Sequence, residues 1–308
     1  MQKKIAIQAN SLNLINIKTD TTLLLALEAQ KRFNEIYWYE TKDLSLIKGK
    51  VYAKAKKVIF FENKKKCFKI LKNVNLDLSK VKYILVRQNP PFNMDYITST
   101  LYLECLPKSV KILNNPISIR NISEKFYSVN FLKFMPPTIF TKNIEEIKKF
   151  TKKYKKIVIK PIHGYGGKNI LFVNKLINKA KFSKYIKKFS HVMVQKFIPQ
   201  VTKGDKRVFI INGLVKGAIQ RVPRKGSFVS NLAQGGKAIK TKLNYKELKI
   251  SKIVAKNLKK NKIFFAGIDL ISNYLIGDIN VTSPTGLKNF KDLTGINLAE
   301  DFWNNLEN

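Results

Sequence analysis

The sequence has few of the residues on which several protein classes depend. Only two cysteines occur in 308 residues, Cys67 and Cys105, and they form no CxxC pair. This spacing suggests neither a zinc ribbon nor a dithiol redox motif, and it predicts ordinary thiols in a reducing cytoplasm. No apolar run approaches the roughly 20 residues of a membrane span. The start of the chain also lacks the continuous apolar segment of a secretory signal, so we expect a cytoplasmic protein with no membrane partner.

Acidic residues are scarce as well. The chain has 20 aspartates and glutamates against 59 lysines and arginines, which gives a formal net charge of +39. The lysines are spread over nearly every segment beside abundant isoleucine and asparagine, a mixture typical of a genome that favours A/T-rich codons. A dedicated nucleic-acid binder concentrates its basic residues on one face and uses arginine forks. We therefore expect no specific nucleic-acid partner and only weak, salt-sensitive adsorption to polyanions.

Arginine and histidine are rare. The six arginines are Arg32, Arg87, Arg120, Arg207, Arg221 and Arg224. Where lysine supplies most of the positive charge, a remaining arginine can mark a position that needs a rigid guanidinium fork. Neither of the two histidines, His163 and His191, has an obvious acid partner in the sequence.

The first third of the chain alternates strand-like and helix-like segments, which predicts an open α/β sheet. Strands are expected at residues 3–10, 35–40, 82–88 and 111–114. A helix is expected at 19–33, with leucines on one face and Thr19 or Asp20 as its N-cap. The pattern changes near residue 122, so we place the main domain boundary there.

Beyond that boundary, helices and strands alternate with glycine-containing loops. Helices are expected at about 123–132, 143–154, 175–188 and 245–260, and strands at about 156–161, 169–173, 191–199 and 264–286. Asn212-Gly213 between two apolar alternations indicates a β-hairpin over 205–222. Arg207 and Arg221 lie on this hairpin fourteen residues apart, so strict pairing places them on opposite faces unless a bulge intervenes.

Three glycines, Gly164, Gly166 and Gly167, fall within four residues between two strand-like runs. Their spacing fits neither a Walker A loop nor GxGxxG, and an apolar run rather than a helix follows. Two interpretations stay open: a plain hairpin turn, or a turn whose backbone N–H groups cover phosphates. Lys160 ends the preceding strand, and it either extends to water or reaches the same phosphates.

The most specific site in the sequence is acidic. Asp269 and Asp278 flank a turn at about 272–274, and residues nine apart share one face of a hairpin with a two-residue loop. Asn280 lies two residues further on and shares this face. Clustered carboxylates repel unless a cation lies between them, and Mg²⁺ takes one or two carboxylates with substrate phosphates and water. We therefore predict a Mg²⁺ site, with two solvated aspartates as the alternative.

The order of these segments resembles the ATP-grasp ligases, and more closely the bacterial glutathione synthetases. The resemblance covers almost the whole chain and rests on the strings "LINIKTDTT", "VRQNPPF", "SEKF", "GDKRV" and "INVTSPTG", of which the last is the most specific. It implies an N-terminal α/β substrate domain at 1–122, followed by a two-lobed ATP-grasp domain at 123–308. The small lobe is expected at about 123–190 and the large lobe at about 191–308.

The resemblance also implies an activity and its ligands. The family activates the carboxylate of γ-glutamylcysteine with ATP as an acyl phosphate, and the amine of glycine then attacks to give glutathione, ADP and phosphate.

The resemblance also assigns residues to these ligands. Carried over, ATP contacts would come from Lys125, Lys160, Gly164, Gly166, Gly167, Gln195, Phe197, Ile198 and Asp205. Asp269, Asp278 and Asn280 would hold Mg²⁺ (or Mn²⁺), and Arg207 and Arg221 would face the triphosphate or the developing acyl phosphate as catalytic residues. The family also implies a homo-tetramer. Phosphoryl transfer needs positioning and charge neutralisation more than a covalent nucleophile, which agrees with these residue types.

The chain departs from the family pattern mainly on the substrate side and in the lid. Asn10-Ser11 stands for Asp-Pro, Gln88-Asn89 for a basic residue and Asp, His163 for Asp, Asp278 for Glu, and Val229-Ser230-Asn231 for Arg-Gly-Asn in the lid. The loss of one donor placed to meet developing charge costs about 10²–10³ in rate. The sequence therefore favours a glutathione synthetase, with two alternatives: a ligase for another acid and amine, or a catalytically weak ATP-binding homologue.

Overall fold

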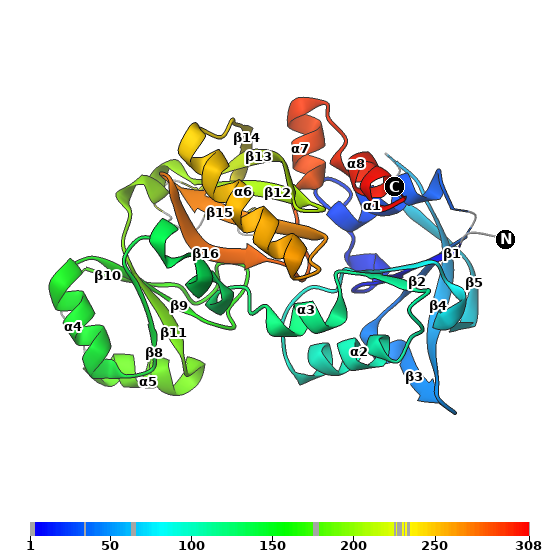
Figure 1. Cartoon of the computed structure of the whole chain (residues 1–308), viewed down its shortest axis with the longest axis horizontal. Coiled ribbons are helices and arrows are strands. Elements are labelled where there is room, and N and C mark those ends of the chain that lie inside the picture. Colours follow the sequence, from blue (N-terminus) through cyan, green and yellow to red (C-terminus); the bar gives the residue numbers. More distant parts are fainter. Residues whose placement is uncertain are drawn as a thin grey trace.

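The computed structural model of the chain describes residues 4–33, 35–62, 66–174, 179–224, 226, 230, 232 and 235–307. Figure 1 shows a four-stranded sheet, a five-stranded sheet and a larger N-terminal sheet in a row, each with helices packed against it. This arrangement confirms the predicted α/β class. Among the described helices, none combines the length and the apolar composition that a membrane span requires. Cys67 and Cys105 are free thiols, as predicted.

The N-terminal sheet has seven strands in the described part of the chain, ordered β3-β4-β2-β1-β6-β7 with β5 paired to β4. The strands are β1 (Lys4–Gln8), β2 (Glu35–Tyr39), β3 (Leu44–Ile47), β4 (Lys50–Phe60), β5 (Phe68–Asp77), β6 (Tyr83–Val86) and β7 (Lys111–Leu113). The helices are α1 (Thr21–Gln30), α2 (Met94–Glu104) and α3 (Pro116–Asn121). β1, β2, β6 and β7 are parallel, and β3, β4 and β5 form an antiparallel extension.

Side chains alternate along β1, and this alternation explains why helices cover both faces of its sheet. Ile7 shares a core cluster with Leu25 of α1, while Ala6 shares another with Tyr96 of α2 and Ile119 of α3. The helix α1 begins where the sequence predicted, because the Asp20 side chain accepts a hydrogen bond from Leu23 N at 2.9 Å.

The four-stranded sheet is antiparallel and has the order β10-β9-β11-β8. Its strands are β8 (Thr138–Thr141), β9 (Ile157–Pro161), β10 (Leu171–Val173) and β11 (Val192–Lys196), and its helices are α4 (Ile144–Tyr154) and α5 (Lys179–Phe189). Because β11 hydrogen-bonds to both β8 and β9, it belongs to this sheet. The lobe division expected near residue 190 stays a prediction. The helix expected at 123–132 is a kinked 3₁₀ helix at Phe126–Phe134.

The five-stranded sheet is antiparallel and has the order β14-β13-β12-β15-β16. Its strands are β12 (Asp205–Ile211), β13 (Leu214–Val222), β14 (Lys237–Lys240), β15 (Phe265–Ile271) and β16 (Tyr274–Asn280). The helix α6 (Tyr245–Lys260) packs against it, with Val254 and Leu258 in the same core as Ile268. The predicted hairpin is confirmed, and Asn212 and Gly213 form its turn with φ of 49° and 75°.

The last two helices, α7 (Leu287–Thr294) and α8 (Leu298–Glu307), return to the N-terminal sheet. In Figure 1 they lie, in red, beside α1. Trp303 of α8 is fully buried, packs on Phe33 at 5.0 Å between ring centroids, and donates from Nε1 to Leu25 O at 3.0 Å. These helices therefore add to the core of the N-terminal sheet although they follow the five-stranded sheet in sequence. The domain division expected at residue 122 stays a prediction.

Asn114 joins the N-terminal part of the chain to the five-stranded sheet. Its Oδ1 accepts from Phe264 N and Phe265 N, each at 2.8 Å. Its Nδ2 donates to Phe265 O and Val281 O, each at 2.7 Å. Asn114 is 4% exposed. Its single buried amide therefore satisfies four backbone groups at the start of β15 and just after β16.

We expect Asn114→Ala to lower the free energy of unfolding by about 3–5 kcal/mol, because it leaves several buried backbone groups without partners. Urea denaturation followed by circular dichroism measures this. Asn130 is exposed and makes a single hydrogen bond to Tyr127 O, so the matched change Asn130→Ala should cost less than about 0.5 kcal/mol. Equal costs for the two changes would contradict the role given to Asn114.

Candidate active site

One cavity lies between the four-stranded and five-stranded sheets. Every residue that the sequence assigned to ATP, Mg²⁺ or catalysis lines this cavity: Lys125, Lys160, Gly164, Gly166, Gly167, Gln195, Phe197, Ile198, Asp205, Arg207, Arg221, Asp269, Asp278 and Asn280. They come from segments up to 155 residues apart, so the fold brings them together. Their individual roles stay predictions.

The glycine loop joins β9 to β10, which pair antiparallel, so it has the hairpin geometry that the sequence left open. Gly166 and Gly167 adopt φ of 64° and 72°, a left-handed conformation that favours glycine. At Gly164 the constraint is space, because a Cβ there would lie 3.2 Å from Pro161 O and the backbone would have to shift by a few tenths of an ångström. Lys125 Nζ donates to Gly164 O, which ties the loop to the start of the 3₁₀ helix.

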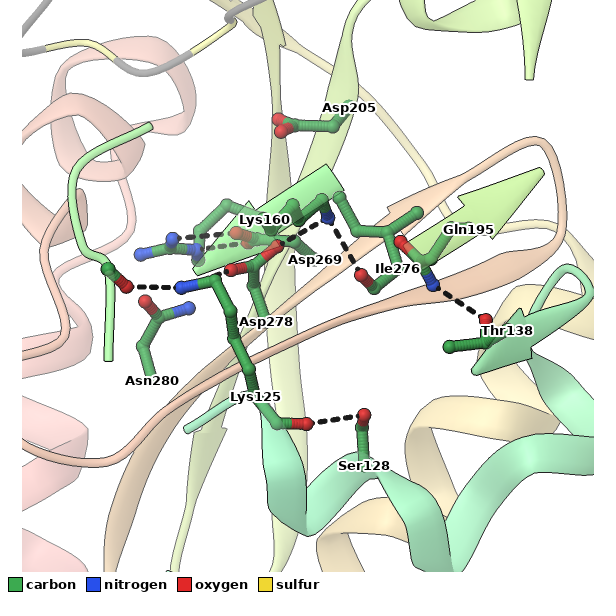
Figure 2. A network of polar contacts seen from close by, with 12 residues as sticks. Lys125, Ser128, Thr138, Lys160, Gln195, Asp205, Asp269, Ile276, Asp278 and Asn280 are labelled. Atoms are coloured by element: carbon green, nitrogen blue, oxygen red, sulfur yellow. Dashed lines mark hydrogen bonds and ion pairs between the residues drawn. The ribbon is translucent and has the colours of Figure 1, made fainter. Parts of the chain in front are cut away.

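Two lysines converge on one aspartate beside this loop, as Figure 2 shows. Lys160 Nζ lies 3.1 Å from Asp278 Oδ2, and Lys125 Nζ lies 3.4 Å from Asp278 Oδ1. Burial raises the pKa of Asp278, but Lys160 and then Lys125 outweigh it and hold that pKa below its ordinary value. Two ammonium groups against one carboxylate leave an excess of positive charge, which suits a phosphate.

Four buried charges alternate in sign on the five-stranded sheet. Arg221 forks Asp205, with Nε–Oδ1 and Nη2–Oδ2 distances of 2.7 Å each. Arg207 forks Asp269, with Nε–Oδ1 at 2.5 Å and Nη2–Oδ2 at 3.0 Å, and Arg221 Nη2 also lies 2.8 Å from Asp269 Oδ2. Burial raises the pKa of Asp269, but the two guanidinium groups outweigh it and keep that pKa below its ordinary value. We call these four side chains the charge row.

A β-bulge places both arginines of the charge row on one face. The register of β12 and β13 shifts between Phe209 and Ile210, so Asp205 stands opposite Arg221 although the turn alone would offset them by one residue. Arg207 follows Asp205 by two residues and therefore shares its face. The bulge that the fourteen-residue spacing required is present.

The adenine end expected for the cavity is mostly apolar. Gln195 is buried and donates from Nε2 to Thr138 Oγ1 at 3.0 Å. Phe197 packs against Phe172 of β10, with ring centroids 4.6 Å apart, and Ile198 lines the same part of the cavity. A flat apolar ring system fits such surroundings, with the polar edge served by backbone groups.

The side chains of Asp269, Asp278 and Asn280 fit a Mg²⁺ ion that also binds phosphate. Asn280 Nδ2 donates to Gly267 O at 3.0 Å, which leaves its Oδ1 for another partner. The carboxylates of Asp269 and Asp278 each offer about four lone-pair sites, more than their present partners use. No group of three His, Cys, Asp or Glu side chains able to hold a metal occurs among the described residues. A Mg²⁺ ion held by two carboxylates and an amide would take its other ligands from water and phosphate.

A second cavity of about 470 Å³ meets the first at Arg221, which lines both. Asn10 and Asn89, two of the departures from the family pattern, line it. They contact each other, because Asn10 Oδ1 accepts from Asn89 N at 2.7 Å. Gln88, the third departure, accepts on Oε1 from Gln8 Nε2. The Asn10 side chain therefore holds the backbone of Asn89, while the Gln88 side chain pairs with Gln8.

Known proteins identify the family. The family model described as "Prokaryotic glutathione synthetase, ATP-grasp domain" matches residues 124–295, and the one for the N-terminal domain matches residues 3–120. The chain belongs to the prokaryotic glutathione synthetase family. Glutathione synthetase from Mesorhizobium japonicum is 35% identical over 312 residues, with 100% of this chain and 99% of that protein covered. Glutathione synthetase from Buchnera aphidicola subsp. Baizongia pistaciae is 37% identical over 299 residues, with 95% and 92% covered.

Solved structures agree on the fold of this glutathione synthetase family member. D-cycloserine synthetase DcsG superposes with a TM-score of 0.67 at 11% identity, covering 98% of each chain. The ATP-grasp ligase PsnB in complex with its minimal precursor superposes with a TM-score of 0.66 at 13% identity, covering 99% of this chain and 97% of that one. The predicted ATP-grasp fold is therefore confirmed. The match to the family model and to the glutathione synthetases shows that the chain is an ATP-dependent ligase.

Sequence reasoning missed several residues of the site. Arg87 lines the second cavity, and two signals pointed to it: the scarcity of arginine and its place in "VRQNPPF". Phe172 carries no motif, and only the β9–β10 pairing brings it to Phe197. In the lid, Val229 and Asn231 lie outside the described residues, while Ser230 between them is buried and lines the first cavity.

We expect Asp269→Asn to lower the free energy of unfolding by about 3–5 kcal/mol, because it leaves two buried guanidinium groups with one carboxylate. Asp292→Asn is the matched control: Asp292 is exposed and pairs with Lys288, and the loss should stay below about 1 kcal/mol. Equilibrium urea unfolding of the two variants compares them. A cost for Asp269→Asn no larger than that of the control would show that the charge row does not stabilise the fold.

Proposed function

We propose that this ligase joins γ-glutamylcysteine to glycine, with Mg²⁺ and ATP, and releases glutathione, ADP and phosphate. The observation that carries the proposal is the full-length similarity to glutathione synthetases together with the single cavity that gathers every expected nucleotide and metal residue. The expected cytoplasmic location and the homo-tetramer belong to the same proposal.

The lysines and the glycine loop would hold the triphosphate. Lys125 and Lys160 share Asp278 and carry one more positive charge than it neutralises. The backbone of the turn that contains Gly166 and Gly167 would approach the phosphates closely, because neither residue has a side chain in the way. Bound Mg²⁺ would neutralise charge on the phosphates, with Asp269, Asp278 and Asn280 as its protein ligands.

The two arginines of the charge row would act where the phosphate is transferred. Each guanidinium uses its Nε edge on a carboxylate of the row, which fixes its plane. Their remaining N–H groups are then preorganised to meet charge on the carboxylate that is being phosphorylated. Arg221 lines both cavities, so the acid would meet the nucleotide there. The glycine amine would then attack the activated carbonyl, and phosphate would leave.

One assay distinguishes this proposal from a related ligase. The protein is incubated with Mg²⁺-ATP, γ-glutamylcysteine and glycine, and phosphate release and product mass are measured. Glutathione formation supports the proposal. Phosphate release with another acid or amine, but not with this pair, would favour a different substrate, as the neutral pair Asn10 and Asn89 allows. No turnover with any tested pair would favour a catalytically weak ATP-binding protein.

We expect Asp278→Asn and Lys160→Ala each to lower the turnover rate at least about tenfold, because each removes a charge placed against the phosphates or their metal. The same coupled assay measures it. Lys149 lies exposed on α4 beside Glu146, so Lys149→Ala should keep the rate of the unmodified protein. Normal rates in both site variants would contradict the assignment of this cavity to ATP.

A further inference from the structure

Arg87 differs from the other buried arginines. It follows β6 and is 5% exposed, much like Arg207 and Arg221 at 5% and 6%. Those two fork carboxylates, but no carboxylate of the described residues forms an ion pair with Arg87. Burial lowers the pKa of Arg87 to about 10, so the group is still charged at neutral pH. The carboxylate of Asp20, on the same cavity, attracts this charge without pairing with it. A buried guanidinium with no carboxylate in contact suggests a ligand that supplies one.

The hydrogen bonds of Arg87 fix its plane and leave one nitrogen unused. Nε donates to Thr22 Oγ1 at 3.2 Å, and Nη2 donates to Pro284 O at 2.8 Å. The guanidinium also lies over the ring of Phe265, with its central carbon 5.6 Å from the ring centroid. Nη1 is buried and has no hydrogen-bond partner. The side chain is therefore held rigidly with a donor to spare.

The cavity that Arg87 lines has room and polarity for a small acid. Its lining includes amide and hydroxyl side chains, among them Asn16, Ser283 and Thr285. Asp20 is the acidic residue of its described lining, and it can accept from an ammonium group. Arg221 marks the end that opens to the nucleotide cavity, whereas Arg87 lines the second cavity only.

We propose that Arg87 binds the α-carboxylate of the γ-glutamyl group and so selects acids that carry a second carboxylate. The proposal rests on the proposed function. γ-Glutamylcysteine has a carboxylate at each end: one has to reach Arg221 to be phosphorylated, and the other then needs a partner deeper in the second cavity. Arg87 is a specificity-determining residue in this account, and it takes no part in the phosphoryl transfer.

The test compares two acids in two proteins. One acid is γ-glutamylcysteine, and the other is N-(4-aminobutanoyl)cysteine, which lacks only the α-carboxylate. In the unmodified protein, removal of this carboxylate should lower kcat/KM about 10- to 100-fold, the usual worth of a charge-assisted hydrogen bond to a buried partner. Arg87→Met should lower kcat/KM for γ-glutamylcysteine by the same factor. Its kcat/KM values for the two acids should then agree within about threefold, with KM for ATP unchanged.

Two controls separate this role from a structural one. Arg120→Met removes an arginine that pairs with Glu104 away from both cavities, and it should keep the preference for γ-glutamylcysteine. Arg87→Lys keeps the charge and loses the fork, so it should fall between the unmodified protein and Arg87→Met. In thermal unfolding, γ-glutamylcysteine should raise the Tm of the unmodified protein more than that of either Arg87 variant.

The possible results are distinct. Glutathione formation by the unmodified protein tests the proposed function by itself. Once that turnover is present, an Arg87→Met or Arg87→Lys protein that still prefers γ-glutamylcysteine by the full factor overturns the assignment of Arg87. Equal losses on both acids would likewise overturn it, because a residue that only supports the fold affects both.

Discussion

The charge row of Asp205, Arg221, Asp269 and Arg207 is the constraint on which the site depends. Direct cross-strand partnership produces it: Asp205 faces Arg221 across β12 and β13, and Arg207 faces Asp269 across β12 and β15. Each charge is almost completely buried, so each needs the neighbour of opposite sign. The row therefore fixes the register of three strands and at the same time orients the two guanidinium groups that face the nucleotide cavity.

The lysine pair works differently from the charge row. Lys125 and Lys160 share Asp278, whose side chain is 24% exposed, and no second carboxylate balances them in the described part of the chain. A polyanionic ligand can replace Asp278 as the partner of these ammonium groups at little cost in free energy. The arginines would lose a bidentate ion pair in such an exchange. The site thus combines a fixed part, which sets geometry, with a part whose partners can be exchanged on binding.

Much of this arrangement follows from the sequence, because local patterns encode it. The cap at Asp20, the Asn212-Gly213 turn and the α/β alternation are set by nearby residues. The membership of β11 in the four-stranded sheet could not be predicted, because strand order in a sheet is not encoded locally. The common face of Arg207 and Arg221 depends on a bulge, and no residue type announces a bulge. The free donor of Arg87 depends on contacts with α1 and with the loop before α7, which only the folded chain brings together.

A crystal structure of the protein with Mg²⁺ and a non-hydrolysable ATP analogue tests the central claim most directly. The account predicts that Arg207 and Arg221 keep their carboxylate partners in the charge row. Lys125 and Lys160 should move from Asp278 to phosphate oxygens, and Asp278 should bind the metal. A structure in which the row dissociates, or in which both lysines stay on Asp278 with the nucleotide bound, would contradict it.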